Sequence, residues 1–169
     1  MSGRGGPRSS VARVQPPLLD RLIDDAPDQE RDPPLSAAES MTALRQSVRR
    51  DLEALLNARR RWRSWPDALT ELKTSPIGYG IPDFAAGTFG DPKRRQELRA
   101  EIEETIRRFE PRFLSVRVHL VEDRDRLEST LRLRIEAVLH AEPAPESITF
   151  DTLVDPSLDD VVVRANEAA

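Results

Sequence analysis

Two stretches of the chain repeat their hydrophobic positions at the spacing of an α-helix. The first opens on Ser36-Ala37-Ala38-Glu39, the pattern of a capping box, in which the serine hydroxyl and the glutamate carboxylate satisfy the first backbone donors of a helix. The apolar positions that follow recur every three or four residues. They are Met41, Leu44, Val48, Leu52, Leu55 and Leu56. We therefore predict a helix from residue 36 to about Arg61, closed by Trp65-Pro66.

The second helical pattern begins at Asp91-Pro92, an N-cap residue followed by proline at the first helical position. Its predicted buried face consists of Leu98, Ile102, Ile106 and Phe109. Pro111 should end this helix, because proline disfavours helical angles at Glu110 and has no N–H to donate.

After Pro111 the hydrophobic period changes from that of a helix to the period of two that is typical of a strand. The alternating apolar residues are Leu114, Val116, Val118 and Leu120 in one strand, and Leu131, Leu133, Ile135, Ala137 and Leu139 within a second run, Leu127–Leu139. A charged turn at 123–126 should join them as an antiparallel hairpin. Further strands are predicted at Ser147–Leu153 and Val161–Arg164. This order predicts an α+β fold, with two main helices packed on a mostly antiparallel sheet of three to four strands.

The two ends of the chain differ from this pattern. Residues 1–34 are dominated by Gly, Ser, Arg and Pro, which predicts a flexible N-terminal arm. Within the arm, Leu18, Leu19, Leu22 and Ile23 would share one side of a short helix. Such a short helix is not stable alone in water, so it should dock either on its own domain or, as an anchor, on a partner. We expect a single domain at 35–164 and a tail at 165–169.

The connector between the predicted helices, residues 66–91, should begin with a short helical piece from Pro66 to Leu72. At its centre lies Gly78-Tyr79-Gly80-Ile81-Pro82-Asp83-Phe84, where two alternate glycines permit unusual backbone angles. The surrounding apolar residues are too many for a free loop, so we predict an extended segment packed over the core. They are Ile77, Tyr79, Ile81 and Phe84. A phosphate-binding loop is disfavoured, since the lysine and the full glycine spacing are missing.

Composition narrows the class of protein. The absence of cysteine excludes disulfides and thiolate chemistry. No apolar stretch reaches the length of a membrane span and no signal-peptide core is present, so we expect a cytoplasmic protein without direct membrane insertion. The net charge of -4 gives no overall attraction to nucleic acid. The basic cluster Arg59–Trp65 could stack on nucleic acid or meet the negative end of the helix dipole, and we favour a structural or protein-contact role.

Few residues suit catalysis or metal binding. His119 and His140 have no neighbouring ligand cluster in the sequence and are interpreted as surface histidines, so neither a metal nor a cofactor is expected. Glu110 is the obvious acid for glycoside hydrolysis, which needs two carboxylates roughly 5–9 Å apart. The nearby Arg108 and Arg112 favour its charged form, so an ion pair or a cap on backbone donors suits it better. We expect no enzyme activity.

Six segments, in order along residues 18–153, carry a family resemblance. They are Leu18-Leu19-Asp20-Arg21-Leu22, residues 47–59, Gly78-Tyr79-Gly80-Ile81-Pro82-Asp83-Phe84, Arg107-Arg108-Phe109-Glu110-Pro111-Arg112, residues 134–139 and Ile148-Thr149-Phe150-Asp151-Thr152. Together they resemble the TssE family, the small baseplate subunit of bacterial type VI secretion systems. That family is similar to the wedge protein of contractile phage tail baseplates, historically called lysozyme-like. The historical label does not imply muramidase activity, although a peptidoglycan-cleaving hydrolase is the alternative function.

The resemblance implies a structural, cytoplasmic baseplate component that joins other wedge subunits and seats the first ring of the contractile sheath. The family's glutamate-proline-arginine motif maps onto Glu110, Pro111 and Arg112, and its connector motif onto the segment that contains Tyr79, Gly80, Pro82 and Asp83. Arg112 is the expected interface residue, because guanidinium groups suit protein contacts; the alternative is an internal contact with Glu110.

An exposed strand edge would fit the implied role, because sheath subunits of this kind are thought to interlock by exchanging strands. We expect residues 147–164 to offer that edge. Proline at Thr149 or Val162 should then abolish sheath assembly without unfolding the subunit.

Overall fold

The computed structural model describes most of the chain from residue 18 onward. The described residues are 18–23, 27–28, 35–60, 66, 68–83, 90–121, 130–141, 144–155 and 160–166. Several sequence predictions lie outside them: most of the arm at 1–34, residues 61–65 of the basic cluster, Phe84, the charged turn 123–126 and residues 167–169 of the tail.

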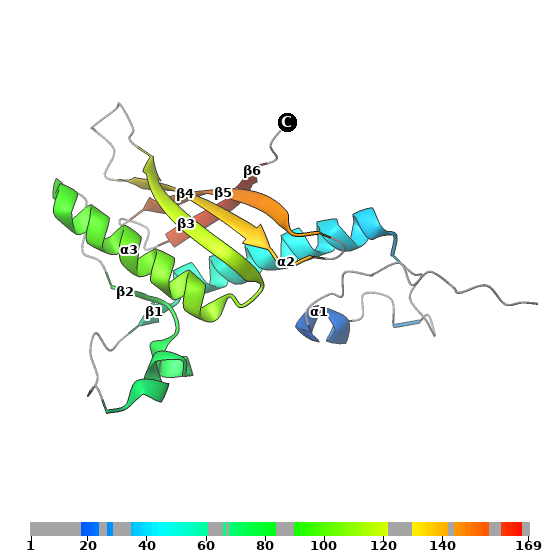
Figure 1. Cartoon of the computed structure of the whole chain (residues 1–169), viewed down its shortest axis with the longest axis horizontal. Coiled ribbons are helices and arrows are strands. Elements are labelled where there is room, and N and C mark those ends of the chain that lie inside the picture. The colour runs from blue at the N-terminus through cyan, green and yellow to red at the C-terminus, as the bar shows by residue number, and fades with distance from the viewer. Residues whose placement is uncertain are drawn as a thin grey trace, which may run out of the picture.

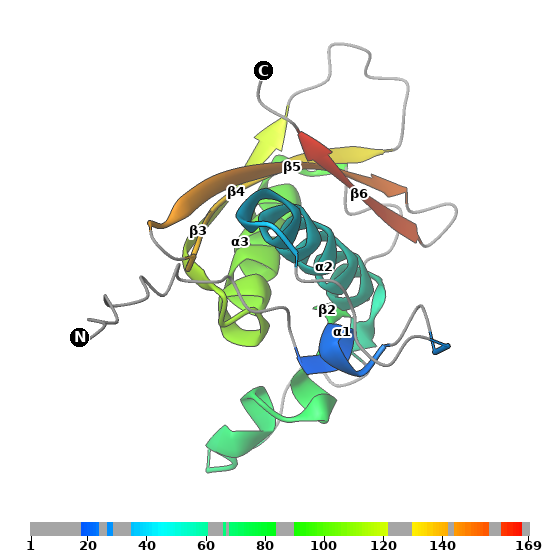
Figure 2. The same cartoon turned by 90° about the vertical axis from the view of Figure 1, so that its right-hand side faces the viewer.

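The described part of the chain has two layers, which confirms the predicted α+β class (Figure 1). Two long helices, α2 (Ala37–Asn57) and α3 (Pro92–Phe109), cover one face of an antiparallel sheet of strand order β3-β4-β5-β6. The strands are β3 (Phe113–Val121), β4 (Leu131–Leu139), β5 (Glu146–Asp155) and β6 (Asp160–Asn166). Figure 2 shows the sheet curving over the helices, with α3 packed against β3 and α2 against β6. The core lies between these layers, and no described helix is long and apolar enough to cross a membrane.

Helix α2 starts as predicted but ends earlier. The Ser36 hydroxyl accepts the Glu39 N–H at 3.2 Å, and the Glu39 carboxylate accepts the Ser36 N–H at 2.7 Å. The helix ends at Asn57 because Ala58 is extended and its carbonyl accepts the Ile81 N–H at 3.0 Å. Residues 59–60 form a short strand, β1 (Arg59–Arg60), parallel to β2 (Ile81–Pro82). A tertiary strand pair therefore overrides the helical pattern that predicted a longer helix.

The arginines of β1 do not extend the helix as predicted, although Arg59 still reaches its end. The Arg59 guanidinium donates to the Leu56 carbonyl at 2.8 Å, a contact with the negative end of α2. Arg60 is buried and its guanidinium meets the Glu101 carboxylate of α3 at 2.6 Å. This part of the basic cluster therefore joins α2 to α3 within the fold.

The connector differs from the predicted helical piece and extended segment. It contains two 3-10 turns, η1 (Thr70–Lys73) and η2 (Pro76–Gly78), before β2. The expectation of a packed segment is correct for Ile81, which is fully buried, and wrong for Ile77, which is 49% exposed. Tyr79 is 37% exposed, and its ring packs on Phe109. The turns close on their own backbone, for example through the Gly78 N–H, which donates to the Ser75 carbonyl at 2.9 Å.

The sheet confirms the predicted alternation, with one exception. The five predicted core residues of β4 are all buried, as are Val116 and Val118 of β3. Leu114 was predicted to share their face, but it is 57% exposed. The register shifts between Phe113 and Ser115, and such a bulge turns the side chains before it to the other face.

The edge strands of the sheet are β3 and β6. Of the predicted edge at 147–164, the β6 part is therefore a free edge and the β5 part is not. Thr149 lies in β5, between Glu136 of β4 and Asn166 of β6, and proline there would remove an interior ladder bond and unfold the subunit. Val162 lies in the edge strand β6, where backbone groups of successive residues point alternately to the two sides. The backbone groups of Val161 and Val163 bond side chains of α2 at the free edge, so the Val162 N–H faces β5. Neither proline variant can therefore test the edge as expected.

Candidate functional site

The corner between α3 and β3 is built by Glu110 and Pro111. The Glu110 N–H donates to the Ile106 carbonyl at 2.9 Å and ends α3. The Phe113 N–H then donates to the Glu110 carbonyl at 3.2 Å, which closes a turn with proline at its second position, where the fixed φ of proline fits. The Glu110 carboxylate also accepts the Arg112 N–H at 3.3 Å. Glu110 therefore caps a backbone donor, one of the uses the sequence suggested.

The Arg112 side chain binds this corner to α2. Its Nε donates to Glu110 Oε1 at 2.5 Å, and its Nη2 contacts Glu110 Oε2, so the pair is bidentate. The same guanidinium reaches Asp51 Oδ2 at 2.7 Å and Ser47 Oγ at 3.2 Å. Burial alone would lower the pKa of Arg112, but the hydrogen bonds and charges of Glu110 and Asp51 outweigh it and raise that pKa. The internal contact that the sequence left as an alternative is present.

A second ion pair extends the cluster to α1 (Leu18–Leu22). Asp20 and Arg50 meet at 2.6 Å, and Arg50 in turn contacts Asp51 at 3.1 Å. Hydrogen bonds from Arg50 and Ser47, with the positive charges of Arg50 and Arg112, lower the pKa of Asp20 against the opposing effect of burial. Charges of alternating sign thus run from α1 across α2 to the corner. We call this set the charge chain: Asp20, Arg50, Asp51, Arg112 and Glu110.

Helix α1 is attached by polar contacts rather than by the apolar stripe predicted to dock it. Leu19, Leu22 and Ile23 are 59%, 73% and 50% exposed, whereas Asp20 is half-buried against α2. Docking of these three side chains on their own domain, one of the two alternatives, is therefore wrong. The Leu18 side chain lies outside the described residues.

The connector motif reaches the same corner through Tyr79. Its ring meets the Phe109 ring edge-on, with 5.3 Å between centroids and 75° between planes. Gly80 makes this possible: its φ is +95°, and a Cβ there would lie 2.3 Å from the Ala58 carbonyl oxygen. The predicted need for unusual backbone angles is confirmed at this glycine. Pro82 is half-buried in β2 and Asp83 is exposed after it; neither lines the corner.

These residues line a surface hollow of about 480 Å³, which we call the corner hollow. Its lining consists of Asp51, Leu55, Tyr79, Phe109, Glu110, Pro111 and Arg112. Burial and the negative charges of Asp51 and Glu110 raise the pKa of Tyr79. A lining that combines aromatic and apolar side chains with an arginine is the composition of a protein-contact surface. Within the described ranges, no group of His, Cys, Asp and Glu could hold a metal ion.

Sequence reasoning placed Leu55 on the apolar face of the first helix and residues 47–59 among the resemblance segments, but it assigned no site role to Ser47 or Asp51. Ser47, Asp51 and Leu55 are spaced by four and so share one face of the helix, and Ser47 is buried despite its hydroxyl. That spacing beside the apolar stripe was the available signal. Their partner Arg112 could not be identified, since it lies 61 positions beyond Asp51.

Comparisons with known proteins identify the family of the chain. A comparison with curated proteins finds no match. The sequence profile of the family described as baseplate wedge protein gp25 matches residues 42–144. This range includes most of α2, the connector, the charge chain from Arg50 to Arg112 and both strands of the first hairpin. This match spans more than half of the chain and confirms the resemblance inferred from the segments above. The chain belongs to the gp25 family of baseplate wedge proteins.

Proposed function

We propose that the chain is the small wedge subunit of a type VI secretion baseplate, where it joins neighbouring wedge subunits and templates the first ring of the contractile sheath by strand pairing. The family supports a structural baseplate role, and the TssE-like segments favour the secretion system over a phage tail. A cytoplasmic location without a cofactor follows from this proposal. The observation that carries it is the corner hollow, where the connector motif and the glutamate-proline-arginine motif meet helix α2 on one surface.

The corner hollow has the features of a wedge contact. Tyr79 and Phe109 offer aromatic area, and aromatic and arginine side chains are enriched among residues that dominate binding energy. Arg112 keeps 22% of its side chain exposed although it binds two carboxylates, so an incoming acceptor could reach it. Glu110 and Pro111 fix its direction. We propose that this surface holds a neighbouring wedge subunit.

Helix α1 supplies a second contact. Its ion pair with Arg50 fixes the helix on α2 while Leu19, Leu22 and Ile23 remain exposed. An apolar stripe on a helix is stabilised when it enters a hydrophobic groove of another protein. We propose that a partner covers this anchor, whose fourth residue is Leu18.

The hydrolase alternative lacks comparable support. Glu110 is 5% exposed and binds Arg112 with both oxygens, and the nearby Asp51 binds the same guanidinium. A carboxylic acid that must donate a proton to a sugar needs access to it. Purified protein should leave a cell-wall suspension turbid, and clearing that is lost in Glu110→Gln would reverse this conclusion.

The hollow can be tested by co-purification from the native host with mass spectrometry of the captured subunits. Tyr79→Ala should lose most of the captured baseplate subunits, with little change in melting temperature, because Tyr79 is 37% exposed. Ile77→Ala is the matched control, from the same connector, 49% exposed and outside the hollow. Equal capture by both variants would contradict a contact at the hollow. Arg112→Ala is less informative, because it also breaks the internal contacts.

The anchor can be tested in the same assay. Leu22→Asp should reduce capture of wedge subunits, whereas Leu69→Asp, at a side chain that is 50% exposed in the connector, should not. If wild-type protein captures no baseplate subunit at all, the proposed function itself fails.

A further inference from the structure

Side chains of the helices bond the backbone at both free edges of the large sheet, more completely on β6 than on β3. On β6, the Asn57 carboxamide donates to the Val161 carbonyl at 2.9 Å and accepts the Val161 N–H at 2.8 Å. The next outward-facing residue is Val163. Arg49 donates to the Val163 carbonyl at 3.3 Å, and Glu53 accepts the Val163 N–H at 3.4 Å. These side chains offer β6 the donors and acceptors that a neighbouring strand would offer.

On β3 a single residue is closed in this way. The Val118 N–H donates to Glu103 Oε2 at 3.1 Å, and Arg99 donates to the Val118 carbonyl at 3.1 Å. Arg99 and Glu103 are joined at 3.0 Å, so the two act as one cap. Because outward-facing residues alternate along a strand, the backbone groups of Leu120 face the same way as those of Val118. Among the described residues, no helix side chain forms a hydrogen bond with the backbone of Leu120.

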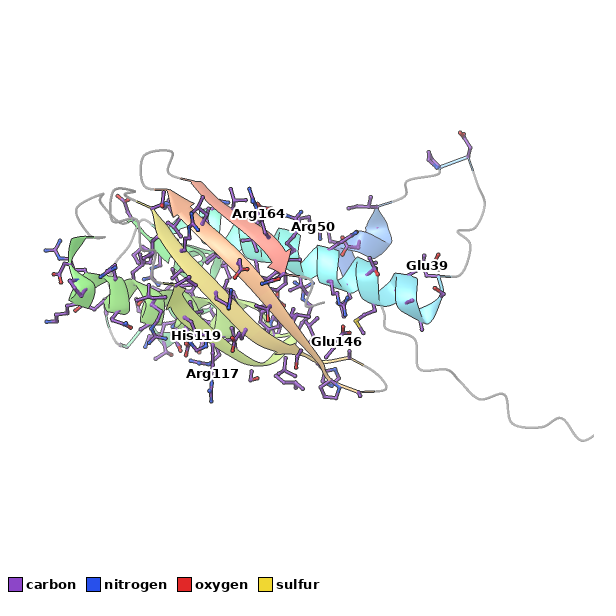
Figure 3. All side chains as sticks on the ribbon, turned by 90° about the horizontal axis from the view of Figure 1, so that it is seen from above. Glu39, Arg50, Arg117, His119, Glu146 and Arg164 are labelled. Carbon is purple, nitrogen blue, oxygen red and sulfur yellow. The ribbon has the colours of Figure 1, made fainter. Side chains whose placement is uncertain are left out.

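The β3 edge also borders a groove between its outer half and the first turns of α3. The groove has a volume of about 560 Å³, and its lining includes Arg95, Arg99, Glu103, Arg117 and Leu120. Figure 3 shows Arg117 and His119 on this side of the sheet, away from Arg164 on the β6 side. An extended segment therefore has space beside the strand whose backbone is less completely closed.

The groove favours negative charge. Three arginines line it, and the lining carboxylate Glu103 is already paired with Arg99 and Arg107. The Nε of Arg95 is buried and has no hydrogen-bond partner within the part of the chain that the structure describes. A buried guanidinium N–H without an acceptor is unfavourable, and a carboxylate in the groove would supply one.

We propose that the β3 edge accepts an extended, acidic strand of a partner protein, and that Glu103 and Arg99 form a gate that must release Val118 for the strand to pair. This inference rests on the proposed strand pairing and moves it from the C-terminal half of the chain to β3. The incoming backbone bonds Val118 and Leu120, and its acidic side chains meet Arg95 and the released Arg99. A second copy of this chain is disfavoured as the occupant, because its own edges carry the same caps.

Binding of a synthetic peptide tests the gate. The probe is as long as β3, alternates valine with glutamate and carries a fluorophore for anisotropy measurements with the full chain. Glu103→Ala should bind it roughly tenfold more tightly than wild type, because the peptide no longer competes with a charged acceptor for the Val118 N–H. Glu103→Gln, which keeps the size of the side chain, should show a smaller gain. Glu104→Ala is the matched control: Glu104 pairs with Arg107 and Arg108 of its own helix, its side chain is 50% exposed, and its loss should change nothing.

Hydrogen exchange locates the strand. The amides of Val118 and Leu120 should exchange more slowly with the peptide bound, and a peptide with lysine in place of glutamate should protect neither. Tighter binding by Asn57→Ala instead of Glu103→Ala would overturn the proposal in favour of β6. The proposal would also be overturned if the peptide neither bound nor protected the wild type or either Glu103 variant. Self-association of Glu103→Ala without peptide binding would overturn it as well, because the cap would then serve to prevent pairing between copies of the chain.

Co-purification separates this inference from the proposed function. Normal capture of baseplate subunits without any peptide effect refutes the β3 strand and leaves the baseplate role intact. Peptide binding with no captured baseplate subunit refutes the baseplate role and leaves the edge in place.

Discussion

Replacing Arg112 with alanine should destabilise the protein strongly, because the substitution leaves a carboxylate buried without its counter-ion. Glu110 is 5% exposed, and among the described residues its carboxylate would keep the backbone N–H of residue 112, at 3.3 Å, as its hydrogen-bond donor. Breaking one side of a buried ion pair costs about 3–5 kcal/mol. The Arg112 and Asp51 side chains are 22% and 36% exposed, so water can replace some of the interactions that the substitution removes, and the cost is smaller. We therefore expect the free energy of unfolding to fall by about 2–4 kcal/mol.

The assay is urea and thermal unfolding of the full chain, followed by circular dichroism, with coincident transitions checked before free energies are compared. The expected loss corresponds to a decrease in melting temperature of about 5–15 °C. Arg107→Ala is the matched control, since Arg107 also binds two carboxylates, at 2.9 and 3.0 Å, but is 55% exposed and should change the melting temperature little.

A double substitution sharpens the test. Glu110→Gln combined with Arg112→Met removes both charges and should recover part of the stability lost in Arg112→Ala, because no uncompensated charge remains buried. If Arg112→Ala is no less stable than Arg107→Ala, or if the double variant is the less stable one, the reasoning from a buried ion pair is refuted.

Three further predictions concern the backbone, the core and an ion pair. Gly80→Ala should lower the free energy of unfolding by roughly 2 kcal/mol or more, measured by urea unfolding, because alanine disfavours a φ of +95° and its Cβ would collide with a backbone carbonyl. Val116→Ser should cost about 2–4 kcal/mol in the same assay, whereas Leu114→Ser should cost almost nothing, since these side chains are 5% and 57% exposed. Arg50→Ala should raise the pKa of Asp20 toward the ordinary 3.8, measured by carboxyl NMR titration. Since the folded pKa lies below the unfolded value, Asp20 stabilises the fold above the unfolded pKa, and this contribution is lost as pH falls through the folded pKa.

Each of these predictions has a contrary outcome. Gly90→Ala, where a Cβ meets nothing within 4 Å, should be neutral, and a similar loss at Gly80 and Gly90 would reject the backbone collision. Equal costs at Val116 and Leu114 would reject the bulge. An unchanged Asp20 pKa in Arg50→Ala would show that α1 is not held by that pair.

The helices and the faces of most strands could be predicted from the sequence because their causes are local. Ser36 and Glu39 form a capping box within one turn, and Asp91 caps the next helix through the Lys93 N–H at 2.9 Å. In β4 every second residue is apolar, and a period of two leaves only one way to bury them. Local sterics at Pro111 likewise end α3 where expected.

The remaining features depend on partners distant in the chain. The early end of α2 needs the strand pair between residues 58–60 and 81–82, and the exposure of Leu114 needs the register that β4 imposes on β3. The motif at the corner was recognised from the sequence, but its ion pair with Asp51 and its hydrogen bond with Ser47 join positions 61 and 65 residues apart. The hydrophobic period of a helix or strand indicates which of its faces is apolar. It does not indicate which other helix or strand will contact its polar side chains.

The sequence by itself thus determined the α+β class, the helix starts, the alternation of the sheet and, through its ordered motifs, the family. Only the tertiary structure decided that Arg112 is tied to Glu110 and Asp51, that Leu19, Leu22 and Ile23 stay exposed, and that the edges are closed by Glu103 and Asn57. The physical reason is that capping, proline sterics and hydrophobic period act within a few residues, whereas ion pairs and edge caps form only when chain folding brings distant polar groups together in a partly dry environment.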